Sequence, residues 1–227
     1  MLKSKGNKRK GGILMENKKM KLWKKILLLL LVIFLVFSIY VIRNFIIIYN
    51  LEEVSKEYAN KTNYIADIYS IQSNSVNILR AYSKDGVYLS IMETKSNDIK
   101  DTRKLTVYKS DNETLGVIQS GDKKIAILNN TMAAEIQVVT FESISDMNLL
   151  QKLLFSTLAR ISTEECNNKE TFLVEMPHDW KMWVNKENGT IVREINSGFV
   201  TKRNYEFDIV KDEDIVKPDI SDCEIQK

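Results

Sequence analysis

Hydrophobic positions divide the chain into one uninterrupted apolar run and a longer part in which apolar and polar residues alternate. The run covers residues 26–42, where Ser38 is the only plainly polar side chain, and residues 43–49 extend it. At about 1.5 Å per residue, the combined segment spans about 36 Å as a helix, more than the roughly 30 Å hydrocarbon core of a bilayer. The pattern predicts a transmembrane anchor over residues 26–49.

Other interpretations of this run fit less well. A cleaved signal peptide has a shorter apolar core followed by small residues, and a lipoprotein signal needs a cysteine directly after the run, whereas the first one here is Cys166. A buried core helix is seldom apolar on every side with a basic cluster beside it. We therefore expect an uncleaved anchor, with the residues at its two membrane surfaces being Trp23, Lys24, Lys25, Arg43 and Tyr49.

After the anchor, residues 50–60 favour a helical continuation, and from residue 61 the period becomes that of strands. Segments such as Val87–Glu93 and Tyr205–Ile209 place apolar residues on one face and polar residues on the other, which is typical of antiparallel strands with one wet face. Turn signals such as Asn188-Gly189 separate them. About nine strands are expected: Val76–Ser83, Val87–Thr94, Arg103–Lys109, Leu115–Gln119, Lys123–Leu128, Thr171–Met176, Lys181–Asn185, Thr190–Ile195 and Val200–Val210.

One helix is predicted among the strands, at about residues 145–160. Ser145 is its expected N-cap, and its apolar face carries Met147, Leu150, Leu154 and Leu158, which the sheet should cover. The fold class is α+β: an N-terminal transmembrane helix, then a curved, mostly antiparallel sheet forming an open half-barrel, with one or two covering helices. The β domain is expected over residues 61–210, followed by an acidic, solubilising tail at 211–227.

Charge is distributed unevenly along the chain. The net charge is +3, but residues 1–25 carry ten basic groups and one acid, which is +9, so the remainder carries −6. The basic excess before the anchor predicts a cytoplasmic N-terminus and an outward-facing domain, at the cell membrane. The near-balance of the total charge argues against a nucleic-acid partner.

Residues 1–14 could be untranslated, because the codons for Lys10–Leu14 can resemble a ribosome-binding site before Met15. The alternative is that these residues form a disordered basic tail.

Residues capable of catalysis or metal binding are scarce. His178 is the only histidine, it lies in a polar loop between strands, and no nucleophile, phosphate-loop or zinc motif accompanies it. We therefore expect no enzyme activity, no cofactor and no metal. Cys166 and Cys223 are the only cysteines. A disulfide between them is chemically allowed outside the membrane and would stabilise by about 4 kcal/mol in the chain-entropy model, but the sequence leaves their pairing open.

The segment Trp183–Arg193 (WVNKENGTIVR) resembles a hairpin of the lipoprotein-carrier-like fold, whose members include lipoprotein carriers and periplasmic sigma-regulator sensors. The ending Asp212–Ile220 resembles the tail of membrane-anchored proteins from low-GC Gram-positive bacteria. The resemblance implies helices over the concave face of an open sheet and a hydrophobic groove, which we expect to be lined by Met147, Leu150, Leu154 and Trp183. The chain departs from the carriers at Asn185, where Asp is usual, and in being tethered.

Two functions follow from these features. The first is a single-pass, membrane-anchored extracytoplasmic domain that binds or senses an apolar ligand such as a lipid, a lipid-linked glycan or a peptide. The alternative is a structural accessory subunit that docks other cell-envelope proteins. The expected partners are the lipid bilayer and either that apolar ligand or an envelope protein.

Overall fold

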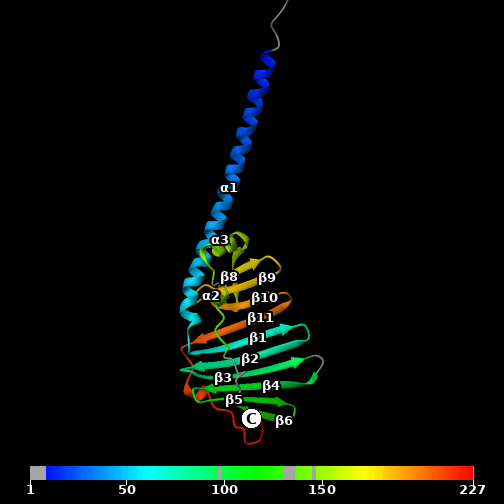
Figure 1. Ribbon diagram of the computed structural model, residues 1–227, viewed down its shortest axis with the longest axis vertical. Helices are drawn as coiled ribbons and strands as arrows, with labels where there is room; N and C mark the ends of the chain where they lie inside the picture. The colour runs from blue at the N-terminus through cyan, green and yellow to red at the C-terminus, as the bar shows by residue number, and fades with distance from the viewer. Residues whose placement is uncertain (1–8, 97–98, 130–135, 145–146, 227) are drawn as a thin grey trace, which may run out of the picture.

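The first described element is a single long helix that continues into a β domain. The computed structural model describes residues 9–96, 99–129, 136–144 and 147–226, so the expected N-cap Ser145 and residues 1–8 of the basic segment lie outside it. Helix α1 (Arg9–Ala59) has 51 residues. Its N-terminal part stands away from the domain, whereas its C-terminal part lies against the sheet (Figure 1). The described part from Lys21 is long and apolar enough to cross a membrane.

Twelve strands form one sheet, and short helices interrupt their sequence. The order along the chain after α1 is β1 (Tyr64–Gln72), β2 (Ser75–Lys84), β3 (Val87–Ser96), β4 (Ile99–Ser110), β5 (Glu113–Ser120), β6 (Lys123–Leu128), α2 (Phe141–Ile144), α3 (Leu149–Leu158), β7 (Arg160–Cys166), β8 (Lys169–Met176), β9 (Trp180–Asn185), β10 (Ile191–Asn196), β11 (Phe199–Phe207), the 3-10 turn η1 (Asp212–Asp214) and β12 (Glu224–Gln226).

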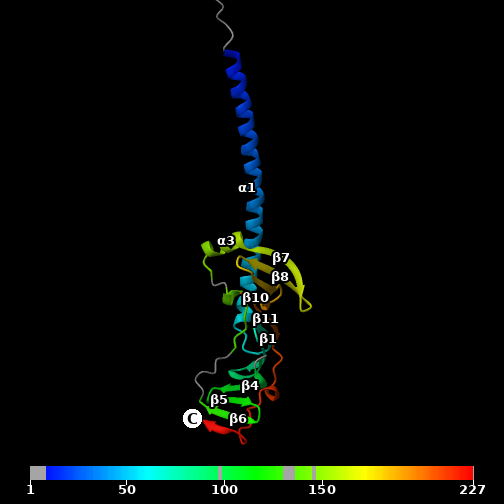
Figure 2. The same cartoon turned by 90° about the vertical axis from the view of Figure 1, so that its right-hand side faces the viewer.

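The sheet consists of two antiparallel meanders joined side by side. Its order is β12-β6-β5-β4-β3-β2-β1-β11-β10-β9-β8-β7, so β1 of the first meander pairs with β11 of the second. Only β12 pairs in parallel, with β6. Because β7 and β12 are the two edges, the barrel does not close, and the turned view shows a bent layer with α1 and α2 on one side (Figure 2). The predicted fold class is confirmed.

Three of the twelve strands were missing from the sequence prediction, namely β1, β7 and β12. Strand β1 sits centrally, and its apolar residues (Ile65, Ile68, Ile71) do not keep a clean period of two, since both faces of a central strand are partly covered. Strand β7 begins at Arg160, where the predicted helix ends. Strand β12 has three exposed residues whose strand geometry depends on pairing with β6.

Tight turns explain why the meanders are regular. The β2–β3, β7–β8 and β10–β11 connections each consist of two residues at positive φ, as in Asp85 (50°) and Gly86 (82°). This is the type I′ geometry that matches the twist of an antiparallel pair. His178 (66°) lies in the three-residue connection between β8 and β9 and is exposed, in agreement with its expected place in a loop.

The main core lies where the C-terminal part of α1 meets strands β7–β10. Its buried residues come from α1, α2, the C-cap of α3 and strands β7–β10: Ile48, Leu51, Phe141, Ala159, Ile161, Val174, Met182, Val184 and Ile191. A second core, around Tyr64, Ala81 and Tyr88, lies over the middle strands, beneath the segment that contains Val138. A small third cluster (Cys166, Leu173, Trp183 and Val192) packs on the opposite face of β9, because Trp183 alternates with Met182 and Val184.

The C-terminal tail is bound along the distal part of the sheet. Three ion pairs join it to three strands: Lys84–Asp212 at the end of β2, Lys217–Glu113 at the start of β5, and Lys124–Asp222 in β6. It then adds β12 to the edge. We call residues 208–226 the C-terminal strap. Asp212 and Asp222 of the strap therefore pair with lysines of the sheet, a role that the solubilising tail expected from the sequence did not include.

The two cysteines are free and lie at opposite ends of the sheet. Cys166 ends the edge strand β7, and Cys223 precedes the other edge strand, β12. Twelve strands have eleven spacings of about 4.8 Å each, which puts the edges roughly 50 Å apart along the sheet. A disulfide needs Cα atoms within about 7 Å, so the disulfide considered from the sequence is excluded within one chain.

Candidate functional site: the junction of the anchor helix and the sheet

Helix α1 enters the domain without a break, and its side chains change character where it does so. Up to Ile39 nearly every described residue is exposed, whereas Asn44, Ile48, Leu51 and Ser55 are buried at intervals of three and four residues. That spacing gives one helical face, and it packs on the strands of the main core. The stripe combines apolar with polar side chains, so its polar members need partners inside the domain.

The C-terminal end of α3 supplies the first of these partners. The amide of Asn44 donates to the carbonyls of Ser156 (3.0 Å) and Ala159 (2.8 Å). The hydroxyl of Tyr40 donates to the same Ala159 carbonyl at 2.5 Å, and Arg43 donates to the Ile161 carbonyl at 3.2 Å. The last carbonyls of a helix lack intrahelical partners. These three α1 residues therefore hold the end of α3 and the start of β7.

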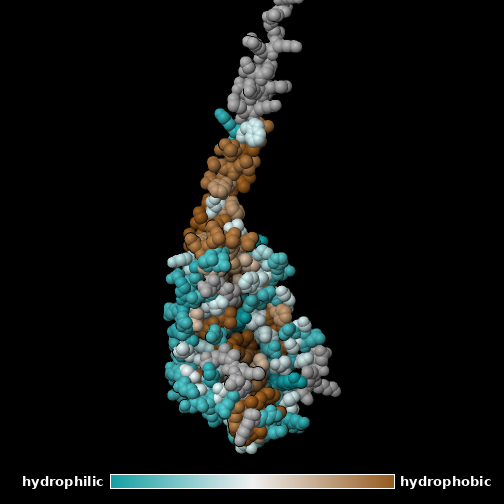
Figure 3. All heavy atoms as spheres, viewed as in Figure 1, coloured by the Kyte–Doolittle hydropathy of each residue, from teal (hydrophilic) through white to brown (hydrophobic). Residues whose placement is uncertain are grey.

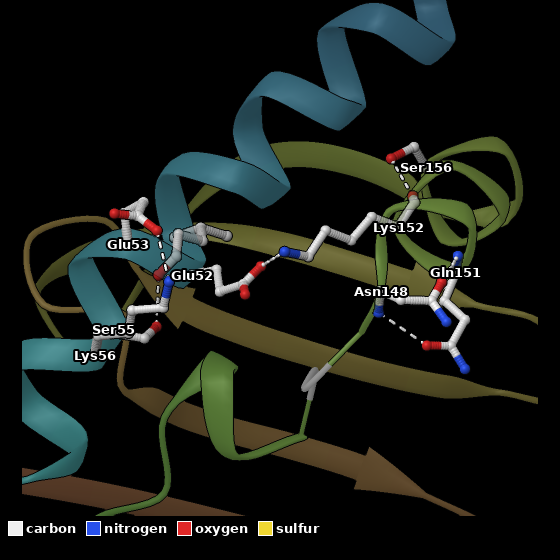
Figure 4. Close-up of polar contacts among 9 residues, drawn as sticks. Glu52, Glu53, Ser55, Lys56, Asn148, Gln151, Lys152 and Ser156 are labelled. Atoms are coloured by element: carbon white, nitrogen blue, oxygen red, sulfur yellow. Dashed lines mark hydrogen bonds and ion pairs between the residues drawn. The ribbon is translucent and has the colours of Figure 1, made fainter.

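An ion pair holds the other side of α3 against α1. Lys152 lies 2.5 Å from Glu52, and both side chains are mostly buried (Figure 4). Ser156, one turn further along, is fully buried on the same side of α3. Asn148 caps α3 through a capping box with Gln151, which takes the place that the sequence prediction assigned to Ser145. The polar side of α3 thus faces the protein.

A close backbone contact locks α1 to the β9–β10 hairpin. The Ser55 hydroxyl donates to Leu51 in its own helix and lies 3.4 Å from the Gly189 carbonyl, which also accepts from the Phe141 amide at 2.8 Å. Gly189 has a φ of 64°, and a Cβ placed on it would come 2.1 Å from the Ser55 hydroxyl. Only glycine meets both conditions, so the Asn-Gly turn predicted from the sequence is also the docking point of α1.

Three tyrosines fix the segment that crosses the inner face below α1. Tyr64 donates its hydroxyl to the carbonyl of Ile136, and the hydroxyls of Tyr88 and Tyr205 accept from the amides of Ile136 and Val139, both at 3.1 Å. Burial raises the pKa of the Tyr205 hydroxyl above its usual value. Together with α1 and α2, this segment fills the part of the inner face where a ligand groove was expected.

The residues expected to line that groove are placed apart from one another. Leu150 and Leu154 are exposed on the outside of α3, so the expectation that the sheet covers this apolar face is wrong. Trp183 is buried on the other face of the sheet, with its indole N–H donating to Glu164 and the Arg193 guanidinium 4.6 Å from its ring. Met147 is half-buried before α3. Trp183 and Arg193 are cross-strand partners in the β9–β10 hairpin, and the register shifts between Ile191 and Arg193.

The residues expected at the membrane surfaces divide into two groups. Trp23, Lys24 and Lys25 are exposed on the free part of α1. Arg43 and Tyr49, in contrast, take part in the junction: Arg43 donates to β7, and the ammonium of Lys152 lies 6.0 Å from the centre of the Tyr49 ring. The protein-free part of the apolar helix therefore ends near Tyr40, earlier than the predicted boundary at residue 49.

Two surface hollows and the distribution of possible metal ligands complete the description of candidate sites. One surface hollow at the β10–β11 turn is lined by Glu194, Asn196, Ser197, Phe199 and Thr201. Another, lined mostly by polar residues, lies between β1, β2, β11 and the β7–β8 turn. Within residues 21–226, apart from the gaps named above, no three His, Cys, Asp or Glu side chains gather as metal ligands would.

Comparison with known proteins gives a distant structural likeness. No family model matches the chain, and no curated protein matches it in sequence. Among solved structures, one titled "Crystal structure of MucB" superposes with a TM-score of 0.38 and 6% identity over 78% of this chain, and one of MucB in complex with MucA(peri) with a TM-score of 0.35 and 6% identity over the same share. The chain spans 64% and 60% of their lengths. At this similarity no residue role is transferred.

Proposed function

We propose that the protein is a single-pass, membrane-anchored extracytoplasmic regulatory domain that docks another envelope protein at a fixed height above the bilayer. The observation that carries the proposal is that anchor and core are one helix: the face of α1 that carries Asn44, Ile48, Leu51 and Ser55 is buried in the domain. A domain joined through a flexible linker would move freely, whereas here the sheet must follow the anchor. The proposal contains no catalytic step.

The charge distribution sets the orientation in this proposal. Residues 1–25 carry +9 and precede the apolar run, so the N-terminus stays in the cytoplasm and the sheet lies outside. The excess of lysine over arginine, 26 to 7, favours an AT-rich genome and hence the envelope of a low-GC Gram-positive bacterium.

Docking of a protein is favoured over capture of an apolar ligand for two reasons. The inner face next to α1 is filled by Ile48, Phe141 and the segment held by the three tyrosines. In addition, β7 is a seven-residue edge strand paired only with β8 in the sheet, and an edge strand can accept a further strand from a partner. The edge strand at the distal end is instead β12, which consists of only three residues of the strap.

Photo-cross-linking in native membranes tests this function. A photoreactive residue at Thr163 or Glu165, both exposed on β7, should give one adduct of defined mass, and the matched position Val216 on the strap should give none. Equal adducts from all three positions, or none from β7, would contradict docking at this edge. Native mass spectrometry of the full chain provides the second arm, since a co-purifying apolar molecule displaced by lipid would favour the ligand-binding function predicted from the sequence.

The whole chain is needed for these experiments. A fragment beginning at residue 50 would lack Asn44 and Ile48, which are both fully buried. Their loss would remove part of the main core and the hydrogen bonds that hold α3, so a negative result from such a fragment would say nothing about the intact protein.

A further inference from the structure

Helix α3 has an exposed apolar surface that is unusual for a helix of a globular domain. Its leucines are between 47% and 74% exposed, and they are Leu149, Leu150, Leu153, Leu154 and Leu158. At 3.6 residues per turn these positions occupy about half of the helix circumference. Large contiguous apolar patches on a protein mark a surface that is covered by something else.

The leucine face of α3 points away from its own protein, while Phe155 on the other side of the helix packs against the main core. A surface helix normally turns its apolar stripe toward the core and its charges toward water. Here Lys152 and Ser156 face inward, to Glu52 and to the Asn44 contact, while the leucines face outward. The fold has thus provided partners for the polar side of α3 and none, among the described residues, for the leucines.

The height of α3 along α1 indicates what covers the leucines. Its C-terminal end is bound by Tyr40, Arg43 and Asn44, which follow directly after the apolar run. From Ile26 to Asn44 the helix rises about 27 Å, close to the thickness of the hydrocarbon core. The end of α3 therefore lies at the level where α1 leaves the bilayer.

The leucine face is also continuous with the exposed apolar surface of α1. Ile39, Ile42 and Ile46 are each more than half exposed on α1 at this level. In the space-filling view, hydrophobic residues run from the stalk of α1 onto the top of the domain, above a largely hydrophilic body (Figure 3). Two segments distant in sequence thus contribute to one apolar surface around the point where the anchor enters the domain.

We propose that α3 is an interfacial helix whose leucine face is immersed in the outer leaflet of the same bilayer that α1 crosses. Helices of this kind lie in the membrane plane with the apolar face at the boundary of headgroups and acyl chains. The inference rests on the proposed membrane anchor. It assigns α1 and α3 together as a two-point attachment, which fixes the tilt of the sheet as well as its distance from the lipid.

Fluorescence quenching in vesicles tests the position of α3. The full chain with Cys166→Ser and Cys223→Ser would receive one cysteine, carrying an environment-sensitive fluorophore, at Leu150, Leu154 or Leu29. Val216, an exposed apolar residue of the strap, is the matched control, because the neighbouring Lys217 pairs with Glu113 of β5 in the distal part of the sheet. In phosphatidylethanolamine–phosphatidylglycerol vesicles, the labels at Leu150 and Leu154 should shift to the blue and lose emission when doxyl-labelled lipid is included, and the label at Val216 should show neither effect.

The label at Leu29 separates failure of this inference from failure of the anchor. Quenching at Leu29 without quenching at Leu150 and Leu154 would overturn the position of α3 and leave the anchor intact. A label at Leu29 that stays in water would overturn both. The signal should also be independent of the protein-to-lipid ratio; loss of the shift at Leu154 on dilution into excess lipid would show that a second copy of the chain covers the leucines.

A substitution pair supplies the second measurement. Leu150→Glu with Leu154→Glu places two charges on the outward face without touching the contacts of Lys152 or Ser156. A label at Leu153 should then move from lipid to water, while the Leu29 label stays quenched. Leu150→Met with Leu154→Met keeps the face apolar and should leave the Leu153 signal unchanged. No change with the glutamates would contradict immersion of α3.

Discussion

The two ends of the sheet are completed by different pieces of the chain. At the membrane-proximal end, α1 covers the inner face of β8–β10 and contributes fully buried side chains such as Ile48. At the distal end, the inner-facing residues of β5 and β6 are covered less fully, and Ile118 is exposed; there the C-terminal strap binds through exposed ion pairs and a three-residue strand. Stability should therefore be concentrated where the anchor enters the domain.

The largest effect is expected from truncating the helix where it forms the core. Ile48→Ala removes a fully buried side chain between α1 and the strands, and such changes cost about 2–5 kcal/mol of the free energy of unfolding. Ile46→Ala, two residues earlier on the same helix, removes an exposed side chain and is the control. Denaturant unfolding of the full chain in detergent, followed by tryptophan fluorescence, measures both. Equal losses would mean that α1 does not stabilise the sheet.

The next effect isolates the contact between α1 and the β9–β10 hairpin. Gly189→Ala and Gly198→Ala both place alanine at positive φ, which costs about 1–2 kcal/mol. Only Gly189 also meets Ser55, so its substitution should cost about 1–3 kcal/mol more, the usual penalty of overpacking. Unfolding midpoints of the two variants give the difference. A difference of zero would show that the helix moves away from the turn at no cost.

A smaller loss is expected from the polar contact that joins α1 to α3. Asn44→Ala leaves the carbonyls of Ser156 and Ala159 without this donor, at a cost of about 1–3 kcal/mol. Asn50→Ala changes an exposed asparagine of the same helix and should be nearly neutral. Hydrogen exchange of the α3 amides should also rise in the first variant only. Unchanged exchange in both would mean that α3 is held by other contacts.

At the distal end, removal of the strap should act locally. Ending the chain at Val210 deletes β12 and three exposed ion pairs, each of which stabilises by at most about 1 kcal/mol. Hydrogen exchange of β6 should accelerate because its outer edge loses its partner strand, while exchange in β8–β10 should not change. Accelerated exchange in both regions would instead show that the two ends unfold together.

The smallest effect distinguishes the two thiols by reactivity alone. Cys166 is buried and Cys223 is only half-buried; desolvation raises the pKa of both thiols, so access to the reagent separates them. In the native protein, maleimide should label Cys223 first, and the labelling of Cys166 should speed up as the pH rises toward and above the usual thiol pKa of about 8.5. Non-reducing mass analysis should find two free thiols. Identical labelling rates would contradict the burial of Cys166.

Periodicity in the sequence predicted most of the strands, because each meander strand and its turn are encoded locally. Nine of the twelve strands follow from alternation and from turn residues such as Asp85-Gly86 and Asn188-Gly189. The same reasoning failed for α3. Its leucines satisfy the helical pattern, but the pattern alone does not say whether they face a sheet or a membrane, since both are apolar. The predicted groove, which relied on that choice, placed Leu150 and Trp183 on one surface when they belong to different ones.

Composition and order along the chain determined the apolar helix, the uneven charge and the meander strands, because these depend on residues near one another in sequence. The tertiary structure alone decided which face of α1 is buried, which strand closes each edge and which way α3 turns. Those outcomes depend on contacts between segments more than a hundred residues apart, such as Asn44 with Ala159 and Ser55 with Gly189. No local pattern carries that information. The partner of a buried asparagine such as Asn44 lies elsewhere in the chain, and the proposed partner of the outward leucines of α3 is lipid.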